Sequence, residues 1–195
     1  MQLEFSAADH SYRLNGRPVV SVTQALAPLA QWLGPEDAVE FARVRGDLVH
    51  AACDLVDREE LDWAQLDPQL VPYLEGYRNF LIDSDATVVA SELRVASPQF
   101  GYAGRLDRLL AIKHSIALVD VKATAVVSQI VGPQTAAYAQ AAKESAGHKR
   151  LRRYCLHLHP THARGYKLTS LSDPADWSVF LSCLNVTAWR NRHAA

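Results

Sequence analysis

The sequence has 195 residues, of which 49% are hydrophobic and 21% charged, and its formal net charge is −1. A chain of this length and composition fits one globular domain whose core needs no disulfide staples. Its near-zero charge gives no global sign of a nucleic-acid binder, and its apolar runs are too short to span a membrane. The amino terminus "MQLEFSAADH" also lacks a signal-peptide pattern, so we expect a soluble, cytoplasmic protein with no membrane partner.

The three cysteines, Cys53, Cys155 and Cys183, are odd in number and scattered, and none forms a C-x-x-C pair. This argues against a disulfide framework and against a four-cysteine zinc or iron–sulfur site. We therefore expect no iron–sulfur cluster, and we expect each cysteine to be a small buried apolar group in a reducing compartment.

The opening stretch "HSYRLNGRPVVSVTQAL" predicts a β-hairpin, because Asn15-Gly16 is the preferred two-residue turn and apolar, strand-forming residues flank it. A short helix is expected next, capped at its start by Thr23 and limited by Pro28.

Two helices are expected to follow the hairpin. The first runs from Pro35 to Asp57, with proline and acidic residues in a favourable first turn. Gly46 lies in its middle and is a poor helix former, which predicts a kink or a close backbone approach there. The second helix runs from about Asp67 to Ile82.

The rest of the chain alternates between strand and helix patterns. Three strand-like runs, "ATVVASELRVA", "YAGRLDRLLAI" and "SIALVDVKAT", come first, and a tight turn at Lys113 to Ser115 joins the last two. A helix opened by Gly132-Pro133, two more strands ("RRYCLHLHP" and "ARGYKLTSL") and a terminal amphipathic helix follow. This order predicts an α/β (α+β) fold with a mixed central sheet flanked by helices.

The run "ALVDVKAT" places two charges on an otherwise apolar strand. Because strand side chains alternate, Asp120 and Lys122 share one face while Val119 and Val121 share the other. Burial of such charges is costly unless they are paired, hydrogen-bonded or bound to a metal. Taken alone, the pair is explained by an ion pair on a surface face, so its neighbours decide the interpretation.

Asp107 interrupts the preceding strand, and the tight turn between the strands can bring its carboxylate next to that of Asp120. Two adjacent carboxylates repel unless one keeps a proton or a cation lies between them. Mg²⁺ or Mn²⁺ is the natural occupant, because hard divalent ions prefer oxygen ligands. The alternative is that Asp107 merely pairs with Arg105 or Arg108.

Three more residues are candidates by their placement. Gln134 and Tyr138 lie one turn apart on the helix after the strand, where they could reach a phosphate or a water. His50 lies in the first long helix among apolar residues. Each has an ordinary explanation as well: a half-buried tyrosine, a solvated glutamine and a hydrogen-bonded core histidine.

Together these motifs resemble the PD-(D/E)XK nuclease superfamily, specifically its RecB-type and phage-exonuclease-like branch. The matching motifs, in the family's order, are "RGDLVH" (Arg45, Gly46, His50), "SELRV" (Glu92), "GRLD" (Asp107), "VDVKAT" (Asp120, Lys122) and "QTAAY" (Gln134, Tyr138). The resemblance extends over most of the chain and includes the amino-terminal hairpin. It implies a restriction-endonuclease-like αβββαβ core in a single nuclease domain, residues 1–195, in which the hairpin and helices of about residues 1–85 pack on a catalytic core of about residues 86–195.

The resemblance also implies a role for each motif residue. Asp107, Asp120 and the backbone carbonyl of Val121 would ligate the metal, and His50 would add a nitrogen ligand. Lys122 would lie beside the attacking water and stabilise developing negative charge. The remaining three would complete the site: Gln134 and Tyr138 by positioning the phosphate or the active-site groups, and Glu92 as a further carboxylate for a second metal or for Lys122.

The implied activity is a Mg²⁺- or Mn²⁺-dependent DNA nuclease, in that branch an exonuclease, acting on linear duplex or single-stranded DNA. The chain carries no phosphate-loop motor, so it would act alone, as a homo-oligomer, or beside a recombination partner protein. Basic residues that could contact the DNA backbone are Arg43, Arg45, Lys149, Arg150, Arg152 and Arg153.

Three other interpretations remain. The nuclease could be a structure-specific endonuclease, or the fold could serve as a catalytically inactive DNA-binding or assembly subunit. The motif "HLHPTH" (His157, His159, His162) occurs in zinc hydrolases, but the barrel that usually hosts it needs about 250 residues. Polar residues on an exposed strand face are a sufficient explanation of that motif.

Overall fold

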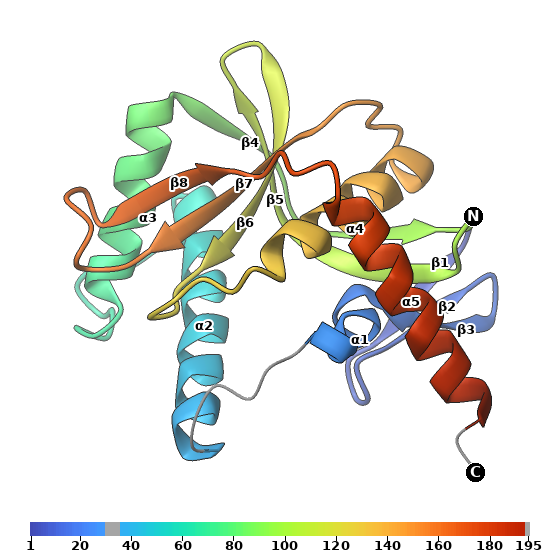
Figure 1. Cartoon of the computed structure of the whole chain (residues 1–195). Helices are drawn as coiled ribbons and strands as arrows, with labels where there is room; N and C mark the ends of the chain where they lie inside the picture. The colour runs from blue at the N-terminus through green and yellow to red at the C-terminus, as the bar shows by residue number, and fades with distance from the viewer. Residues whose placement is uncertain (30–35, 194–195) are drawn as a thin grey trace.

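The computed structural model describes residues 1–29 and 36–193 (Figure 1). The strands are β1 (Leu3–Ser6), β2 (Ser11–Leu14), β3 (Arg17–Ser21), β4 (Ala86–Ser97), β5 (Tyr102–Ile112), β6 (Ser115–Lys122), β7 (Arg152–Leu158) and β8 (Tyr166–Ser170). The helices are α1 (Val22–Ala25), α2 (Glu36–Asp57), α3 (Val71–Ser84), α4 (Val131–Ser145) and α5 (Asp176–His193), with a 3₁₀ turn, η1, at Ala27–Leu29.

The described strands form one eight-stranded mixed sheet, in which β3–β5 and β6–β7 pair in parallel and the other pairs are antiparallel. β5 is its centre: β4 pairs along one edge, while β3 and β6 share the other edge. On this shared edge, β3 pairs with Tyr102 and Ala103, and β6 pairs only from Arg108 onward. The sheet therefore opens between these two pairings.

Helices cover both faces of the sheet (Figure 1). Side chains from α1, α4 and α5 pack on one face around Leu106, Leu109 and Leu118, whereas α2 and α3 pack on the other around Leu110 and Val119. Because both faces are covered, β6 is buried along almost its whole length, which explains its nearly continuous apolar sequence. The prediction of a mixed sheet flanked by helices is confirmed.

The amino-terminal hairpin forms as predicted, with Asn15 and Gly16 both at positive φ in the turn. An unpredicted strand, β1, pairs with β2 and extends this unit to three strands. The predicted helix cap is wrong by two residues: Ser21, not Thr23, caps α1, in a capping box with Gln24.

The two long helices match their predicted positions to within a few residues. Pro35 lies outside the described residues, and α2 begins at Glu36. α3 begins at Val71 rather than near Asp67 and ends at Ser84. Of the two alternatives predicted for Gly46, the close backbone approach is wrong, because an added Cβ would meet open space; α2 continues through this position.

The three cysteines are buried and free, as expected. In the part of the chain that the structure describes, none of the helices is both long enough and apolar enough to cross a membrane.

Candidate metal-dependent active site

Three carboxylates lie side by side across the centre of the sheet. The pairs Ser91↔Arg108 and Leu93↔Leu106 flank Glu92 and place it opposite Asp107. Continuing the β5–β6 register past Arg108↔Val119 places Asp107 opposite Asp120. The row of Glu92, Asp107 and Asp120 thus runs across β4, β5 and β6, at the point where the sheet opens.

The backbone holds this row in unusual ways. The Asp107 carboxylate accepts a hydrogen bond from the Val121 backbone N–H at 2.8 Å, so a side chain replaces the strand ladder here. Glu92 has φ of 49°, a left-handed conformation that is uncommon for a residue other than glycine within a strand. Such strain persists only where the surroundings enforce it, and it concentrates at functional sites.

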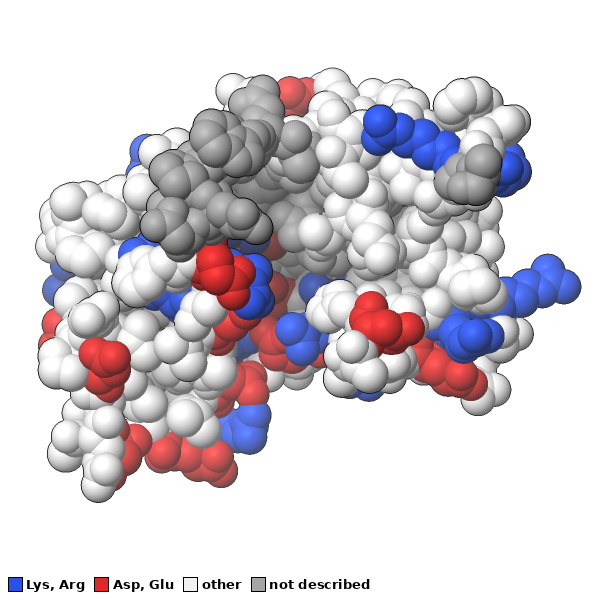
Figure 2. Space-filling view, turned by 90° about the horizontal axis from the view of Figure 1, so that it is seen from below, with Lys and Arg blue, Asp and Glu red and all other residues white. Residues whose placement is uncertain are grey.

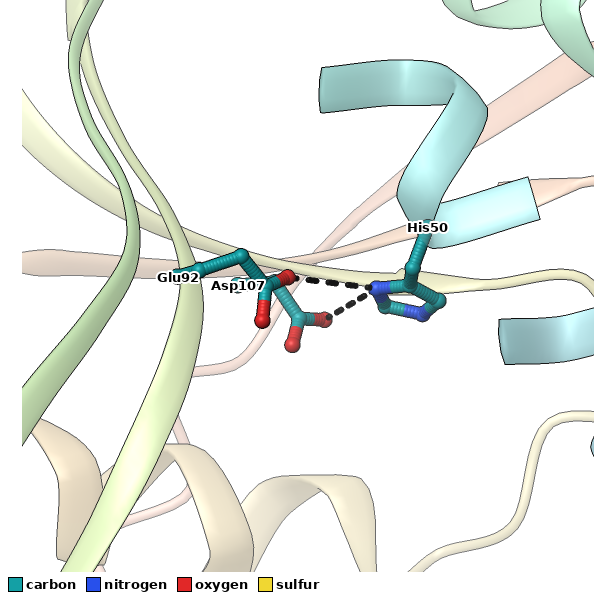
Figure 3. Close-up of side chains that lie close together, drawn as sticks. All are labelled: His50, Glu92 and Asp107. Atoms are coloured by element: carbon teal, nitrogen blue, oxygen red, sulfur yellow. Dashed lines mark ion pairs between the residues drawn. The ribbon is translucent and has the colours of Figure 1, made fainter. Parts of the chain in front are cut away.

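His50 reaches this row from α2 (Figure 3). Its Nδ1 lies 3.8 Å from Asp107 Oδ2 and 3.9 Å from Glu92 Oε1, while its Nε2 lies 3.1 Å from the carbonyl oxygen of Val121. One potential ligand atom from each of His50, Glu92 and Asp107 falls within 4.8 Å of the others. The structure therefore brings a histidine together with two carboxylates and a carbonyl, as the sequence motifs imply.

The pKa of His50 reflects this crowding. Burial alone lowers the pKa of the imidazole, but attraction to Asp107 and a hydrogen bond to Glu92 outweigh burial and raise it. Positive charge is thus stabilised at the point where the ring faces the two carboxylates. A divalent cation would satisfy the same negative charge more fully than a proton does.

Asp120 is buried beside the group, and its Oδ2 pairs with Lys122 Nζ at 2.6 Å. Its other oxygen, Oδ1, has no partner among the described residues. Burial raises the pKa of Asp120 to about 6, although the attraction of Lys122 acts to lower it. A metal ion would satisfy this buried, unpartnered oxygen.

The donor set fits a hard divalent cation. It consists of carboxylate oxygens, one backbone carbonyl and one imidazole nitrogen, a mixture that suits Mg²⁺ or Mn²⁺. Of the two imidazole nitrogens of His50, Nδ1 faces the carboxylates of Asp107 and Glu92, whereas Nε2 lies at a hydrogen-bond distance of 3.1 Å from the Val121 carbonyl oxygen. Asp120 is the outlying member, because its carboxylate turns toward Lys122.

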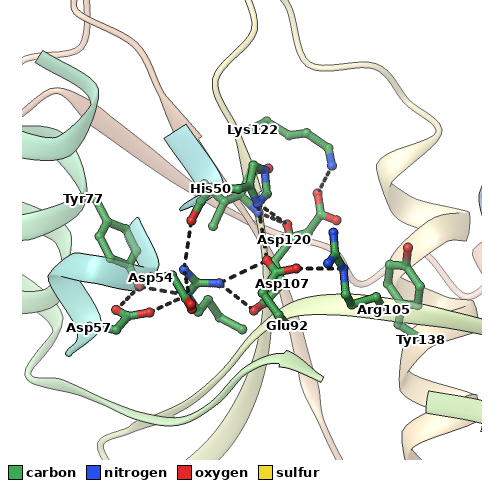
Figure 4. A network of polar contacts seen from close by, with 12 residues as sticks. His50, Asp54, Asp57, Tyr77, Glu92, Arg105, Asp107, Asp120, Lys122 and Tyr138 are labelled. Atoms are coloured by element: carbon green, nitrogen blue, oxygen red, sulfur yellow. Dashed lines mark hydrogen bonds and ion pairs between the residues drawn. The ribbon is translucent and has the colours of Figure 1, made fainter. Parts of the chain in front are cut away.

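One buried guanidinium, that of Arg108, contacts all three members of the ligand group. Figure 4 shows these three residues, His50, Glu92 and Asp107, close together. The guanidinium donates to the Asp107 carbonyl at 2.8 Å, lies 3.4 Å from Glu92 Oε1, and reaches the His50 carbonyl at 3.5 Å. Its other side is held by Asp57 at 2.6 Å and by the Tyr77 hydroxyl at 3.3 Å. Arg108 therefore fixes α2 and α3 to the strands that carry the carboxylates.

Neither arginine pairs with the Asp107 carboxylate, contrary to the simpler interpretation of the sequence. Arg105 forms an ion pair with Glu92 at 2.8 Å, and Arg108 meets only the backbone of Asp107. Both arginines contribute to the site, yet neither was predicted to do so. The available signal was the pattern "GRLDRLL", in which two cations flank an acid on a buried strand.

The open sheet edge becomes a pocket of about 620 Å³. β4 to β6 line its floor with Glu92, Asp107 and Lys122, the amino-terminal hairpin forms one wall, and α2 forms the other. Figure 2 shows the molecule hollowed on this side, with acidic and basic side chains gathered around the hollow. The size lies within the about 300–1,000 Å³ of pockets that hold a small organic ligand, the size class of a nucleotide.

Tyr138 lines this pocket from α4, and Gln134 lies behind it, donating to the tyrosine hydroxyl at 3.4 Å. Burial raises the pKa of Tyr138, so its hydroxyl stays protonated and can donate a hydrogen bond. Gly104 makes room for the ring: a Cβ there would lie 2.6 Å from a Tyr138 ring carbon. The i, i+4 pair thus forms as the sequence spacing suggested, and Tyr138 is the member of the pair that lines the pocket.

The fold is similar to that of a solved structure. A structure described as that of a candidate exonuclease from Eubacterium rectale matches with a TM-score of 0.51 and 11% identity, over 89% of this chain and 79% of that one. An alkaline exonuclease from Laribacter hongkongensis, LHK-Exo, matches with a TM-score of 0.42 and 14% identity, over 90% and 93%. The chain has an exonuclease-like fold. No protein-family model and no curated protein sequence matches it.

Within this exonuclease-like fold, the first pair of candidate DNA-binding residues lies on α2. Arg43 is exposed at the pocket wall and pairs with Glu40 and Asp47. Arg45 instead turns inward, and its guanidinium donates to the Ala123 carbonyl at 3.2 Å. Arg43 is therefore the member of this pair that faces the pocket.

The second basic group lies elsewhere. Arg152 pairs with Ala117 near the start of β6, whereas Lys122 lies at the end of that strand. Lys149 and Arg150 are exposed beside a separate hollow of about 420 Å³. Arg153 has a structural role, because it pairs with Asp176 at 2.9 Å and donates to the Gly132 carbonyl.

Proposed function

We propose that this chain is a DNA nuclease of the PD-(D/E)XK superfamily, RecB-type branch, which uses Mg²⁺ or Mn²⁺ and acts as an exonuclease. The proposal takes residues 1–195 as one nuclease domain. One observation carries it: buried Asp120, whose Oδ1 has no partner among the described residues, lies beside the His50–Glu92–Asp107 group and pairs with Lys122, where the sheet opens into a pocket. The exonuclease-like fold agrees with this activity.

In this proposal Asp107, Asp120, His50 and the Val121 carbonyl hold the cation. Glu92 is a further ligand, released for that role when its ion pair with Arg105 opens. A divalent cation bound here would lower the pKa of a water molecule and neutralise charge on the scissile phosphate.

Lys122 supplies the fixed positive charge beside the attacking water. Its ion pair with Asp120 holds Nζ at the edge of the ligand group, and attraction to Asp120 outweighs burial to raise the pKa of the ammonium. The group therefore stays charged, so it orients the water and stabilises the negative charge that develops on the phosphate rather than removing a proton. Tyr138, oriented by Gln134, lines the pocket from α4 and donates toward the phosphate.

The shape of the pocket supports action at a strand end. Both walls rise above the carboxylate row, and a hollow of about 620 Å³ admits one or two nucleotides of one strand rather than a duplex. Arg43 and the more distant Lys149, Arg150 and Arg152 would attract the phosphate backbone through unspecific electrostatics. Arg45 and Arg153 would support these surfaces through their contacts with the fold. The protein would work in the cytoplasm, alone, as a homo-oligomer, or with a recombination partner protein.

A cleavage assay tests the proposal. Labelled linear duplex DNA, single-stranded DNA and a covalently closed circle are incubated with the protein in Mg²⁺, in Mn²⁺ and in EDTA. We expect metal-dependent release of nucleotides from the linear substrates and none from the circle. Efficient cutting of the circle would indicate an endonuclease, and binding of DNA without cleavage in either metal would indicate an inactive binding subunit.

A further inference from the structure

Three histidines gather at one end of β7, outside the site described above. His157 lies on β7, and His159 and His162 lie in the turn between β7 and β8. Their ring centroids are separated by 4.8 Å (His157–His162), 5.7 Å (His157–His159) and 6.1 Å (His159–His162). All three are half-buried, so their rings are held by the fold yet open to solvent.

The hydrogen bonds of His157 decide which of its nitrogens is available. Nε2 lies 2.7 Å from the carbonyl oxygen of Thr124, which can only accept, so Nε2 carries the proton and Nδ1 carries the lone pair. His162 Nε2 lies 3.0 Å from this Nδ1. A histidine whose second nitrogen donates to a backbone carbonyl has the arrangement that orients metal-bound imidazoles in proteins.

We propose that His157, His159 and His162 form a binding site for a transition-metal ion of the zinc type. Two nitrogens bound tetrahedrally to zinc at 2.0–2.1 Å lie about 3.4 Å apart, close to the separation of His157 Nδ1 and His162 Nε2. Three imidazoles around one such ion have ring centres roughly 5 Å apart, near the separations of this cluster. A turn of the His159 ring toward the other two completes the set.

The ligand chemistry separates this site from the carboxylate site. Imidazole nitrogens without carboxylates suit Zn²⁺, Ni²⁺ or Co²⁺, whereas Mg²⁺ prefers oxygen ligands. Burial and the neighbouring His157 and His159 lower the pKa of His162, which keeps its ring neutral and able to ligate. Lys167, opposite His157 on β8, is a charge that opposes binding.

The turn that carries the cluster is already ordered. Backbone hydrogen bonds link His159 to Gly165 and His162 to His159. Gly165 lies against Gly76 of α3 so closely that a Cβ on Gly76 would lie 2.3 Å from the Gly165 carbonyl oxygen. Arg164 also pairs with Asp83 of α3. His157 and His162 are therefore held close to their binding positions before an ion arrives, which lowers the entropy lost on binding, whereas His159 must leave its contact with the Thr161 hydroxyl at 2.7 Å.

The cluster also adjoins the proposed catalytic strand. Lys122 and His157 are paired in the β6–β7 register, and the Thr124 carbonyl that accepts from His157 lies two residues beyond Lys122. An ion bound to His157 would fix the segment that follows Lys122. Zinc binding itself does not depend on nuclease activity, so it is tested separately.

The test is a titration with Zn²⁺ in excess Mg²⁺, followed by calorimetry. His50→Ala serves as the parent protein, because this change removes the nitrogen ligand of the carboxylate site. We expect one Zn²⁺ per chain in the parent and in a matched control, His50→Ala/His114→Ala, whose second change lies in the exposed turn before β6. In His50→Ala/His162→Ala the affinity should fall at least tenfold.

Thermal unfolding supplies a second measurement on the same proteins. Zn²⁺ should raise the midpoint in the parent and the His114 control but not in the His162 variant, because a ligand that binds only the folded state stabilises it. If the His162 variant fails to fold, His159→Gln replaces it with the same expectations. Equal Zn²⁺ affinity in the His162 and His114 variants, or no Zn²⁺ binding by the parent, would overturn the proposal whatever the nuclease assay shows.

Discussion

The side chain of Asp107 takes the place of a backbone partner between β5 and β6: its Oδ2 accepts a hydrogen bond from the backbone N–H of Val121 at 2.8 Å. The same oxygen lies 3.8 Å from His50 Nδ1. One carboxylate therefore closes the sheet on one side and faces the proposed cation on the other. This double role explains how β6 can diverge from β5 without leaving the Val121 amide unsatisfied.

Asp107→Asn separates these two roles. The asparagine carbonyl oxygen can still accept from Val121, so we expect the variant to fold with near-normal stability. Loss of the negative charge should weaken Mn²⁺ binding by tenfold or more and reduce DNA cleavage by at least a hundredfold. Calorimetry with Mn²⁺ and a linear-DNA cleavage assay check both effects. Near-normal cleavage would show that the metal site is assigned wrongly.

Lys122→Ala should reduce turnover without weakening metal binding. Lys122 pairs with Asp120 but is not proposed as a ligand, so Mn²⁺ affinity should be retained or raised once the competing ammonium is gone. Turnover should still fall by at least a hundredfold, because no fixed charge remains to orient water and stabilise the phosphate. Asp120→Asn is the matched control and should lose turnover and metal affinity together. A Lys122 variant that loses metal binding as fully would contradict the separation of roles.

The sequence was sufficient to predict the parts of the site that depend on local pattern. The Lys113–Ser115 turn and the alternation of "VDVK" determine that Asp107, Asp120 and Lys122 come from adjacent strands, and the structure confirms this arrangement. The i, i+4 spacing likewise predicts the contact between Gln134 and Tyr138. These relationships involve neighbours in one hairpin or one helix, so periodicity is enough.

Features that depend on long-range register could not be predicted. An arginine on a strand is ordinarily read as exposed, and only the packing of α2 and α3 on β5 shows that Arg108 is fully buried. The left-handed backbone at Glu92 lies between the β4–β5 pairs Ser91↔Arg108 and Leu93↔Leu106, a long-range register that local pattern does not reveal. The role of Arg153 likewise depends on α5, which places Asp176 beside it.

Arg108 is expected to position the ligand group rather than to touch DNA. Arg108→Lys keeps the buried charge but cannot donate at once to the Asp107 and His50 carbonyls, so α2 should shift relative to the strands. We expect Mn²⁺ affinity to fall about tenfold while the fold is retained. Arg108→Ala would instead leave Asp57 uncompensated and destabilise the protein by about 3–5 kcal/mol.

Arg105→Lys is the control for this experiment, because Arg105 also contacts Glu92 but is 45% exposed and ties no helix to the sheet. Its Mn²⁺ affinity should stay within about twofold of the wild-type value. Calorimetry on both variants, with circular dichroism to confirm folding, decides the question. Equal Mn²⁺ affinity in Arg105→Lys and Arg108→Lys would show that Arg108 does not position the metal ligands.

Gly104→Ala tests the place of Tyr138 in the pocket. A Cβ at position 104 would lie 2.6 Å from the tyrosine ring and 3.1 Å from Val22, so the ring must move. We expect cleavage to fall at least tenfold, while Mn²⁺ binding is unchanged because no proposed ligand is displaced. Tyr138→Phe, which removes only the hydroxyl, should show a similar loss of activity with normal stability. Full activity in both variants would exclude Tyr138 from the reaction.

Gly46→Ala tests whether the glycine of the "RGDLVH" motif is needed by the fold. An added methyl group meets open space, and alanine is a better helix former than glycine by about 0.8–1.0 kcal/mol. We therefore expect the free energy of unfolding to rise by about that amount in urea denaturation, with Mn²⁺ affinity unchanged. Cleavage of linear DNA should stay within twofold of wild type if the position only forms helix. A stable variant with normal Mn²⁺ binding and much weaker cleavage would instead mean that DNA passes against α2 at Gly46, where a side chain blocks its approach.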